Sequence, residues 1–507
     1  MKISISYPPL ESKKGTPLLS QNRQFQWFKD PTYIYPVVPA YAATLLKENG
    51  FDVFWDDGIA ESLTYDKWIL RLKNEKPDII VFETKTPVVK RHWQIISDIK
   101  KIYDQPANED KLKNCYNFPI VILMGDHVTA MPEESLINSK VDFIITGGDY
   151  DFSLLGLCNA LKNISSLDDL KNIPSGIYYR KGQEILNSGK FKLDNDLNKL
   201  PYIDRNLTNW KLYAYKNGNF KHTPGTYVMA GRDCWYGRCS FCSWTTLYPG
   251  KNFRTTNVSK YLDEIGILIE KFKVKEIFDD TGCFPIGNWL DEFCKGMIKR
   301  GYNKKVTMGC NMRVGALSQQ EWSLLKQANF RMILIGLESI VPSTLERLNK
   351  GINASNIETT LKMAKYAGLE PQLTTMIGYP WETIDDAAMT INFAKKMFKK
   401  GYIDTLQATI VVPYPGTPLF DDARNNGWLL TEDWNRYDMK ESVWRSPVTN
   451  EDVLKFAQDL YTSALNPYFI FKKLVSIRNI DDIKFIFKAG KKVLSHFTDF
   501  KKENNGY

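Results

Sequence analysis

The sequence predicts an α/β chain with a doubly wound parallel sheet at the N-terminus, then a partial (β/α)6 barrel, then a small helical C-terminal region. Two observations predict this class. Short apolar segments of strand length alternate with helical patterns twice along the chain, which is typical of parallel strands covered by helices. The chain also has 507 residues, enough for two or three domains with sizeable cores.

Residues 1–165 contain the first alternation. Its strand candidates span 2–7, 51–56, 78–83, 120–125 and 142–147. Parallel sheets of this kind bind ligands beyond the carboxyl ends of their strands. In this chain those ends carry PP (8–9), ETKTP (83–87), GDHVTAMPEE (125–134) and GGDYD (147–151). Glycine and other turn residues are common in loops that approach a ligand closely, so we expect a ligand at this edge.

The remaining chain divides into three parts. Residues 166–224 are polar and rich in turn residues, which predicts a linker carrying a hairpin. Residues 225–430 predict the barrel, and residues 431–507 predict the helical C-terminal region. The barrel strand candidates span 226–231, 274–280, 305–310, 331–338, 371–378 and 406–412, spaced by helices as in an open β/α barrel.

Composition favours a soluble protein of the cytoplasm. Apolar residues make up 43% and charged residues 25%, and no uncharged apolar run is long enough for a transmembrane helix. The N-terminal MKISISYPPL is an alternating strand rather than a signal peptide. Eight cysteines, three of them clustered, suit a reducing compartment. The net charge of +9 is mild and without a long basic tract, so we expect no nucleic-acid partner.

Three cysteines follow the first barrel strand within the segment GRDCWYGRCSFCSWTTLYPG (231–250). Cys234, Cys239 and Cys242 have the spacing C-x4-C-x2-C. Structural zinc needs a fourth close ligand, but the histidines are scattered and Cys283 is 41 residues beyond the last cysteine of the loop. The same spacing occurs in plant-type two-iron ferredoxins, which take their fourth cysteine later in the chain. A 4Fe–4S cluster with three protein ligands would instead leave one iron open for a substrate or cofactor.

The cysteine loop and the strand ends around it resemble the radical S-adenosylmethionine (SAM) superfamily. The resemblance implies a 4Fe–4S cluster on Cys234, Cys239 and Cys242 that binds SAM and reductively cleaves it to a 5′-deoxyadenosyl radical. It also implies SAM contacts from residues that follow the strands: Phe241, Asp280, Thr281, Arg313, Glu338 and Met376. The superfamily usually has C-x3-C-x2-C, and the extra residue here falls in a loop that contains Gly237.

A parallel-sheet domain ahead of such a barrel resembles the cobalamin-binding radical SAM enzymes, over residues 1 to about 430. The resemblance implies a Rossmann-like cobalamin-binding domain whose strand ends hold the corrin, and methylation of an unactivated carbon of an apolar substrate. The residues implied for cobalamin are Thr84, Thr86, Gly125, His127, Thr129 and Gly147. The alternative is a doubly wound domain that uses no corrin.

Three features depart from the cobalamin-binding pattern. Asp126 and His127 are adjacent rather than arranged as D-x-H-x-x-G, so we expect His127 to hydrogen-bond within its loop rather than ligate cobalt. GGDYD (147–151) stands where relatives tend to have a Gly–Glu–Gly–Glu run. Glu83 and Lys85 are also more charged than expected for a surface that faces a corrin.

Other reactions and partners remain open at this level. The same radical could drive carbon–carbon coupling or cyclisation without methyl transfer, and the third hypothesis is a non-catalytic iron–sulfur electron carrier or zinc scaffold. We expect a small-molecule substrate, for which a lipid or a tetrapyrrole is plausible, and a reductant such as flavodoxin or ferredoxin. Buried structural thiols are the default interpretation of Cys283, Cys294 and Cys310.

The C-terminal segment 466–500 interleaves apolar and basic residues at helical spacing. This pattern favours helices that cap the barrel, because amphipathic helices usually face a core. Docking on an anionic membrane surface is the alternative, which would make the protein peripheral to the membrane.

Overall fold

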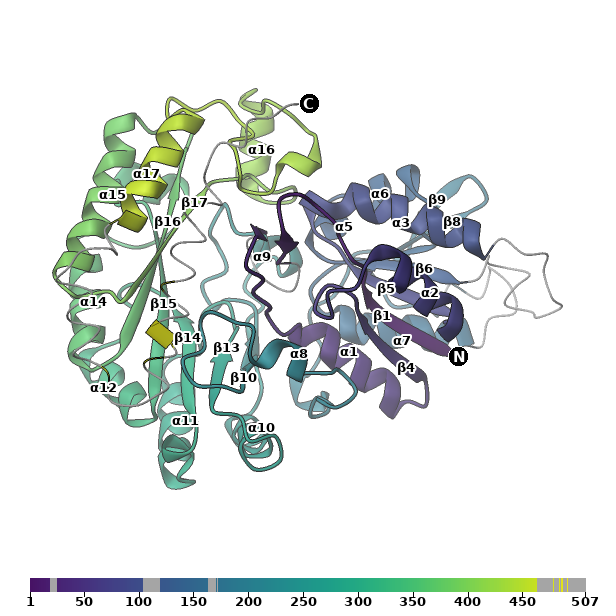
Figure 1. Ribbon diagram of the computed structural model, residues 1–507, viewed down its shortest axis with the longest axis horizontal. Helices are drawn as coiled ribbons and strands as arrows, with labels where there is room; N and C mark the ends of the chain where they lie inside the picture. The colour runs from purple at the N-terminus through teal and green to yellow at the C-terminus, as the bar shows by residue number, and fades with distance from the viewer. Residues whose placement is uncertain are drawn as a thin grey trace.

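The computed structural model describes residues 1–18, 25–103, 119–162 and 172–462, with isolated positions 170, 477, 483, 485, 486 and 490. Two sheets, the first mainly and the second wholly parallel, form the two halves of the molecule, and each is flanked by helices (Figure 1). The predicted α/β class with two parallel-sheet domains is confirmed. The C-terminal pattern at 466–500 lies outside the described residues apart from five of those isolated positions.

The first sheet has the order β4-β1-β5-β6-β7-β8-β9. Its first five strands are parallel and lie where the sequence predicts them: β1 (Lys2–Tyr7), β4 (Asp52–Asp57), β5 (Ile79–Glu83), β6 (Ile120–Met124) and β7 (Phe143–Ile145). The hairpin expected within 166–224 is β8 (Ile177–Lys181) with β9 (Glu184–Asn187), and it extends this sheet antiparallel to β7. The strand order reverses between β1 and β5, the point at which such sheets bind ligands.

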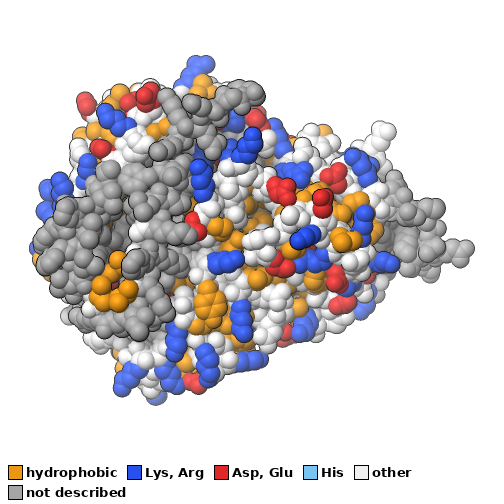
Figure 2. All heavy atoms as spheres, viewed as in Figure 1, with side chains coloured by type: hydrophobic (Ala, Val, Ile, Leu, Met, Phe, Trp, Pro, Cys, Tyr) orange, Lys and Arg blue, Asp and Glu red, His pale blue; other side chains and the backbone are white. Residues whose placement is uncertain are grey.

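Helices cover both faces of the first sheet, which explains why β5 and β6 are apolar along nearly their whole length. Every residue of these two strands is buried. The helices are α1 (Val37–Glu48), α2 (Tyr65–Glu75), α3 (Val89–Ile102), α5 (Asp126–Ala130), α6 (Pro132–Asn138) and α7 (Tyr150–Lys162). Basic and acidic side chains alternate over this domain, at the right of Figure 2.

The second sheet has six parallel strands in chain order, as an open β/α barrel does. They are β10 (Gly225–Val228), β13 (Glu276–Asp279), β14 (Thr307–Met312), β15 (Phe330–Glu338), β16 (Glu370–Ile377) and β17 (Thr405–Ile410). The helices between them are α10 (Val258–Glu270), α11 (Asn288–Lys299), α12 (Gln319–Gln327), α13 (Pro342–Arg347), α14 (Ser355–Tyr366) and α15 (Ile384–Lys399). Capping boxes at Ser318–Glu321 and Thr383–Asp386 begin α12 and α15.

After the last barrel strand the chain returns to the first domain. α16 (Pro418–Asn425) is followed by η5 (Trp434–Arg436), which contacts η1 (Thr86–Val88) and α3, whereas α17 (Asn450–Thr462) packs on α15 and β17. The remaining short elements are β2 (Thr16–Pro17), β3 (Trp27–Phe28), η3 (Leu197–Lys199), α8 (Lys211–Ala214), β11 (Gly231–Arg232), α9 (Trp244–Leu247), β12 (Arg254–Thr255) and η4 (Tyr302–Lys304). Among the described helices, none combines the length and the apolar character needed to cross a membrane.

Candidate functional site

The three cysteines lie in one loop that follows β10 and is closed at its base by the two-stranded ribbon β11–β12. In this ribbon Arg232 stands opposite Arg254. Cys234, Cys239 and Cys242 are all half-buried. Cys234 also forms an isolated parallel bridge with Cys283, directly beyond β13. The loop therefore stands over the carboxyl ends of the first barrel strands, the face at which such barrels carry their active sites.

Gly282 allows the cysteine loop to pack this closely on the end of β13. A Cβ at this position would lie 2.9 Å from the Cβ and 3.0 Å from the backbone nitrogen of Cys234. Backbone atoms cannot move aside cheaply, so only glycine fits. Next to it, burial and the contact with Cys234 raise the pKa of the Cys283 thiol well above its ordinary value. Cys294 and Cys310 are likewise buried thiols.

Two cations lie beside the second cysteine. Burial raises the pKa of the Cys239 thiol, and the charges of Lys350 and Arg313 oppose that rise. The Arg313 guanidinium lies 3.5 Å from the centre of the Tyr236 ring and donates to the Lys350 carbonyl at 2.5 Å. The Lys350 ammonium lies 5.4 Å from the centre of the Phe241 ring. Two cations beside the Cys239 thiol suit an anionic cluster bound through thiolates, because neighbouring cations favour the thiolate form.

Lys350, which lies beside Cys239, also forms a nearly buried ion pair with Glu338. Lys350 Nζ lies 2.8 Å from Glu338 Oε1, and the Thr374 hydroxyl donates to Glu338 Oε2 at 3.4 Å. Glu338 has a φ of +65°, a strained conformation for a residue other than glycine, of the kind that gathers at functional sites. Lys350 was not predicted from the sequence, because its only local signal is a Lys-Gly pair after a short helix.

Tyr379 carries a buried hydroxyl that finds no hydrogen-bond partner among the described residues. Burial, and then the carboxylates of Glu338 and Glu382, raise its pKa well above the ordinary value, so the hydroxyl keeps its proton. Met376 packs in the same apolar cluster, with Phe241 at its edge. A buried hydroxyl without a partner costs about 1–3 kcal/mol, so this position fits a polar ligand that completes it.

The two acids at the end of β13, Asp279 and Asp280, have different surroundings. Asp279 is buried and accepts hydrogen bonds from the backbone of Ala230 at 2.7 Å and of Thr281 at 3.0 Å, so it stabilises the strand ends. The Thr281 hydroxyl accepts from the Gly231 backbone at 3.1 Å. Burial, and then the charge of Asp280, raises the pKa of Tyr227.

The structure thus divides the residues predicted to contact SAM into two groups. Arg313 and Glu338 lie near Cys239, and Phe241 and Met376 join them through the Lys350 contact and the shared apolar cluster. Asp280 and Thr281 follow β13, on the side of the loop where Cys234 meets Cys283.

The strand ends of the first domain are held by hydrogen bonds between neighbouring loops. Gly125 has a φ of +126°, and a Cβ there would lie 2.3 Å from the Thr84 carbonyl oxygen. The Thr84 hydroxyl bonds to Nδ1 of His92 at 2.7 Å. The Gly147 backbone donates to the Thr129 hydroxyl at 3.1 Å. The loops after β5, β6 and β7 therefore form one connected edge.

Both ring nitrogens of His127 are engaged within the protein. Nδ1 bonds to the Thr86 hydroxyl at 3.1 Å and Nε2 to the Glu134 carboxylate at 3.0 Å. The Trp434 indole donates to the same carboxylate at 2.8 Å and lies 5.5 Å from the imidazole, centre to centre. The C-terminal region therefore covers this histidine.

Glu83 and Lys85, which are more charged than expected for a surface that faces a corrin, both bind partners within the protein. The Tyr7 hydroxyl donates to Glu83 at 2.6 Å, and Lys85 pairs with Asp126 at 3.3 Å. Burial raises the pKa of Glu83 to about 7, although Lys85 and Tyr7 oppose that rise. A carboxyl with this pKa is partly protonated at neutral pH, which reduces the charge at the strand ends.

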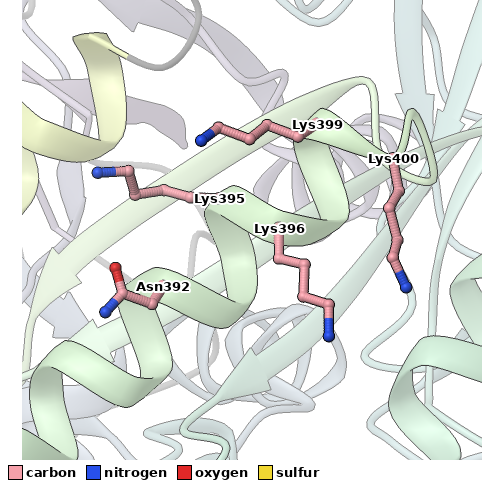
Figure 3. A pocket seen from close by; sticks show the side chains of 5 residues that line it. All are labelled: Asn392, Lys395, Lys396, Lys399 and Lys400. Atoms are coloured by element: carbon pink, nitrogen blue, oxygen red, sulfur yellow. The ribbon is translucent and has the colours of Figure 1, made fainter.

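A separate hollow of about 460 Å³ lies on the outer helix α15 (Figure 3). Asn392, Lys395, Lys396, Lys399 and Lys400 line it. Helices of a β/α barrel run back from the catalytic face, so the C-terminal end of α15 lies at the opposite end of the barrel. This hollow is therefore not part of the cysteine site.

Known proteins resemble this chain in sequence, one family model over the barrel and individual relatives over most of its length. Residues 229–394 match the family model of the radical SAM superfamily. An uncharacterised methyltransferase of Pyrococcus horikoshii is 28% identical over 87% of this chain and 90% of its own length. The anaerobic magnesium-protoporphyrin IX monomethyl ester cyclase of Cereibacter sphaeroides is 22% identical over 81% of this chain and 63% of its own length.

The fold also resembles a solved structure over both domains. The radical SAM methyltransferase TsrM from Kitasatospora setae, with cobalamin and a [4Fe–4S] cluster bound, superposes with a TM-score of 0.65 at 13% identity. The match covers 92% of this chain and 89% of that chain. At this identity the match shows that the two chains share an overall fold.

Proposed function

Residues 229–394 form a radical SAM domain, and we propose that this enzyme methylates an unactivated carbon of a small apolar substrate with cobalamin held in its first domain. One observation carries the proposal: the fold matches a cobalamin-bound radical SAM methyltransferase along nearly the whole chain, in both domains. The radical SAM domain does not support the alternative of a non-catalytic electron carrier or zinc scaffold.

The cysteine loop would hold the 4Fe–4S cluster through Cys234, Cys239 and Cys242. When bound, the cluster supplies the electron that cleaves SAM, and the corrin supplies the methyl group. Arg313 and Lys350 stabilise the negative charge of thiolates at this position, because they oppose the burial that disfavours the ionised form of Cys239. Because Gly282 has no side chain, the loop can pack directly on the end of β13.

The residues that lie near Cys239 would orient SAM beside the cysteines. The protonated Tyr379 hydroxyl is available to donate to a polar group of the ligand, and Met376 and Phe241 exclude water from the same cluster. Glu338, held by Lys350, is available to accept hydrogen bonds from ribose hydroxyls. A fixed orientation matters because a radical must meet only its target hydrogen.

Residues of the strand ends after β5, β6 and β7 would hold the corrin. Thr84, Thr86, Gly125, Thr129 and Gly147 lie on the connected edge at which doubly wound sheets bind ligands. His127 stays hydrogen-bonded to Thr86 and Glu134 and so would support the loop rather than ligate cobalt.

The substrate is proposed to be a tetrapyrrole or another apolar small molecule. The similarity to a cyclase that acts on magnesium protoporphyrin monomethyl ester supports this class. The same relative favours the second candidate function, a radical cyclisation or carbon–carbon coupling without methyl transfer. We further propose a cytoplasmic location and reduction of the cluster by flavodoxin or ferredoxin.

Cofactor content tests the proposal directly. The chain is purified anaerobically with cobalamin supplied, and iron and cobalamin are counted per chain. About four irons with one cobalamin, and labelled methyl transfer from SAM to a tetrapyrrole, would support radical methylation. About four irons without cobalamin would reject it and leave cyclisation or coupling as the function.

A further inference from the structure

We propose that Asp149 and Asp151 are positioning residues that fix the cysteine loop to the first domain, so that the cofactors of the two domains are held in one geometry. Both acids belong to GGDYD (147–151), the loop and helix start that follow β7. The inference rests on the proposed function, because it concerns a cofactor in each domain.

The base of the cysteine loop presents two arginines to the first domain. Arg232 and Arg254 are directly opposite each other in the ribbon β11–β12, so they mark the two ends of loop 233–253. Cys234 follows Arg232 by two residues. Whatever holds this pair of arginines therefore fixes where the loop begins and ends.

Both arginines bind Asp149. The Arg254 guanidinium donates to the two carboxylate oxygens of Asp149 at 2.7 and 2.9 Å, and Arg232 donates to Oδ1 of the same residue at 3.3 Å. Arg232 also binds both carboxylate oxygens of Asp151, one of them at 2.8 Å. We call these four residues the interdomain clasp.

The clasp is almost completely buried. The side chains of Arg232, Asp149 and Asp151 are 2%, 2% and 0% exposed, and that of Arg254 is 17% exposed. Its two positive and two negative charges balance. Planar bidentate contacts of this kind fix orientation as well as distance, and burial protects them from screening by salt.

Two further hydrogen bonds join the cysteine loop to GGDYD. The Tyr248 hydroxyl donates to the Gly148 carbonyl at 3.0 Å, and the Gly148 backbone donates to the Leu247 carbonyl at 2.9 Å. A Cβ on Gly148 would lie 2.1 Å from an atom of the Tyr248 ring. Since Tyr248 and Leu247 belong to loop 233–253, this loop is joined to GGDYD at its base and along its length.

The clasp also connects with the edge proposed to hold the corrin. Gly147 lies two residues before Asp149 and is hydrogen-bonded to Thr129. A ligand that orders Gly147 and Thr129 would therefore order Asp149, and through it both ends of the cysteine loop. Such coupling is reciprocal, so the state of the loop would equally affect binding in the first domain.

Two clasp variants and one matched control test this proposal in the full-length protein. Asp149→Asn removes the charge shared by the two arginines. Arg254→Gln removes the most exposed member and leaves the Arg232–Asp151 pair, so it provides the test if Asp149→Asn does not fold. Asp142→Asn breaks the buried Lys100–Asp142 pair, 2.6 Å long, within the same domain but outside the clasp.

The first measurement is hydrogen exchange of loop 233–253 in the protein without cofactors. We expect exchange in this loop to be at least about tenfold faster in both clasp variants than in wild type, and unchanged in the control. Equal exchange in all four proteins, or equal acceleration in the control, would overturn the proposal. This readout is independent of whether cobalamin is bound.

The second measurement uses the reconstituted protein. We expect cobalamin to change the electron paramagnetic resonance spectrum of the reduced cluster in wild type and control, and this response to be lost in the clasp variants at unchanged iron content. Methyl transfer should fall by about 10²-fold, more than SAM cleavage does, because small misplacements have effects of that size. A response retained in the clasp variants would refute the coupling. Wild type with four irons and no cobalamin would reject the methyl-transfer function alone, leaving the exchange result to decide on the clasp.

Discussion

Lys350 is the counter-ion of Glu338, and Lys350→Met tests how much this buried ion pair contributes to stability. The two side chains are 10% and 7% exposed, and their charged atoms are 2.8 Å apart. At an effective dielectric constant of about 20, unit charges at this distance attract by about 6 kcal/mol before desolvation is subtracted. Methionine keeps the apolar stem but leaves the carboxylate buried without its cation, which costs about 3–5 kcal/mol. We expect the free energy of unfolding to fall by that amount.

The assay is anaerobic urea denaturation of the protein without cofactors. Lys295→Met is the matched control, because its pair with Asp291 is exposed and such pairs contribute about 0–1 kcal/mol. In the double variant Glu338→Gln with Lys350→Met neither charge of this pair remains, so we expect it to recover most of the lost stability.

Two results would refute this reasoning. Lys350→Met could lose no more stability than Lys295→Met, which would mean that solvent reaches the carboxylate. Alternatively, the double variant could be as unstable as Lys350→Met alone, and the loss would then come from packing rather than from an unpaired charge.

Three further predictions concern the cluster and the strand ends. Cys239→Ala should lose most of its iron and form no 5′-deoxyadenosine from SAM; product formation by this variant would defeat the cluster assignment. Gly282→Ala should destabilise the fold by about 1–3 kcal/mol and lower iron content, because its Cβ would press on Cys234, and an unchanged melting curve with full iron would contradict this packing. Burial raises the pKa of Glu83 from 4.5 to about 7, so its contribution to stability is fully present below about pH 4.5 and is lost as the pH rises through 7. As the pH rises from about 4.5 to 8.5, the free energy of unfolding of Glu83→Gln should therefore increase by about 3 kcal/mol relative to that of wild type. If urea denaturation gave the same pH dependence for both proteins, this prediction would be wrong.

Local patterns in the sequence were enough to predict the strands and the position of the cysteine loop. Strands of a sheet covered on both faces are short apolar runs, and β5 and β6 are buried at every position. The spacing of Cys234, Cys239 and Cys242 is local as well, and so is its place after β10. These features follow from neighbours along the chain, which is why reading the sequence recovers them.

The clasp shows what the sequence could not supply. The acids of GGDYD seemed only a departure from related enzymes, because nothing near residues 147–151 indicates a partner. Arg232 follows Asp151 by 81 residues and Arg254 follows Asp149 by 105 residues. Only the docking of the cysteine loop on the first domain brings these charges together.

The two α/β domains, the three thiols of the loop and most of the strand-end residues around them could thus be predicted from local patterns. Only the packing of distant segments shows that Lys350 pairs with Glu338 and that both nitrogens of His127 are engaged. It also shows that the buried Tyr379 hydroxyl finds no partner within the part of the chain that the structure describes. The two kinds of feature differ in how far apart along the chain the interacting residues lie. Strand patterns and thiol spacing depend on residues a few positions apart, whereas a buried charge or hydroxyl takes its partner from whichever segment the fold packs against it.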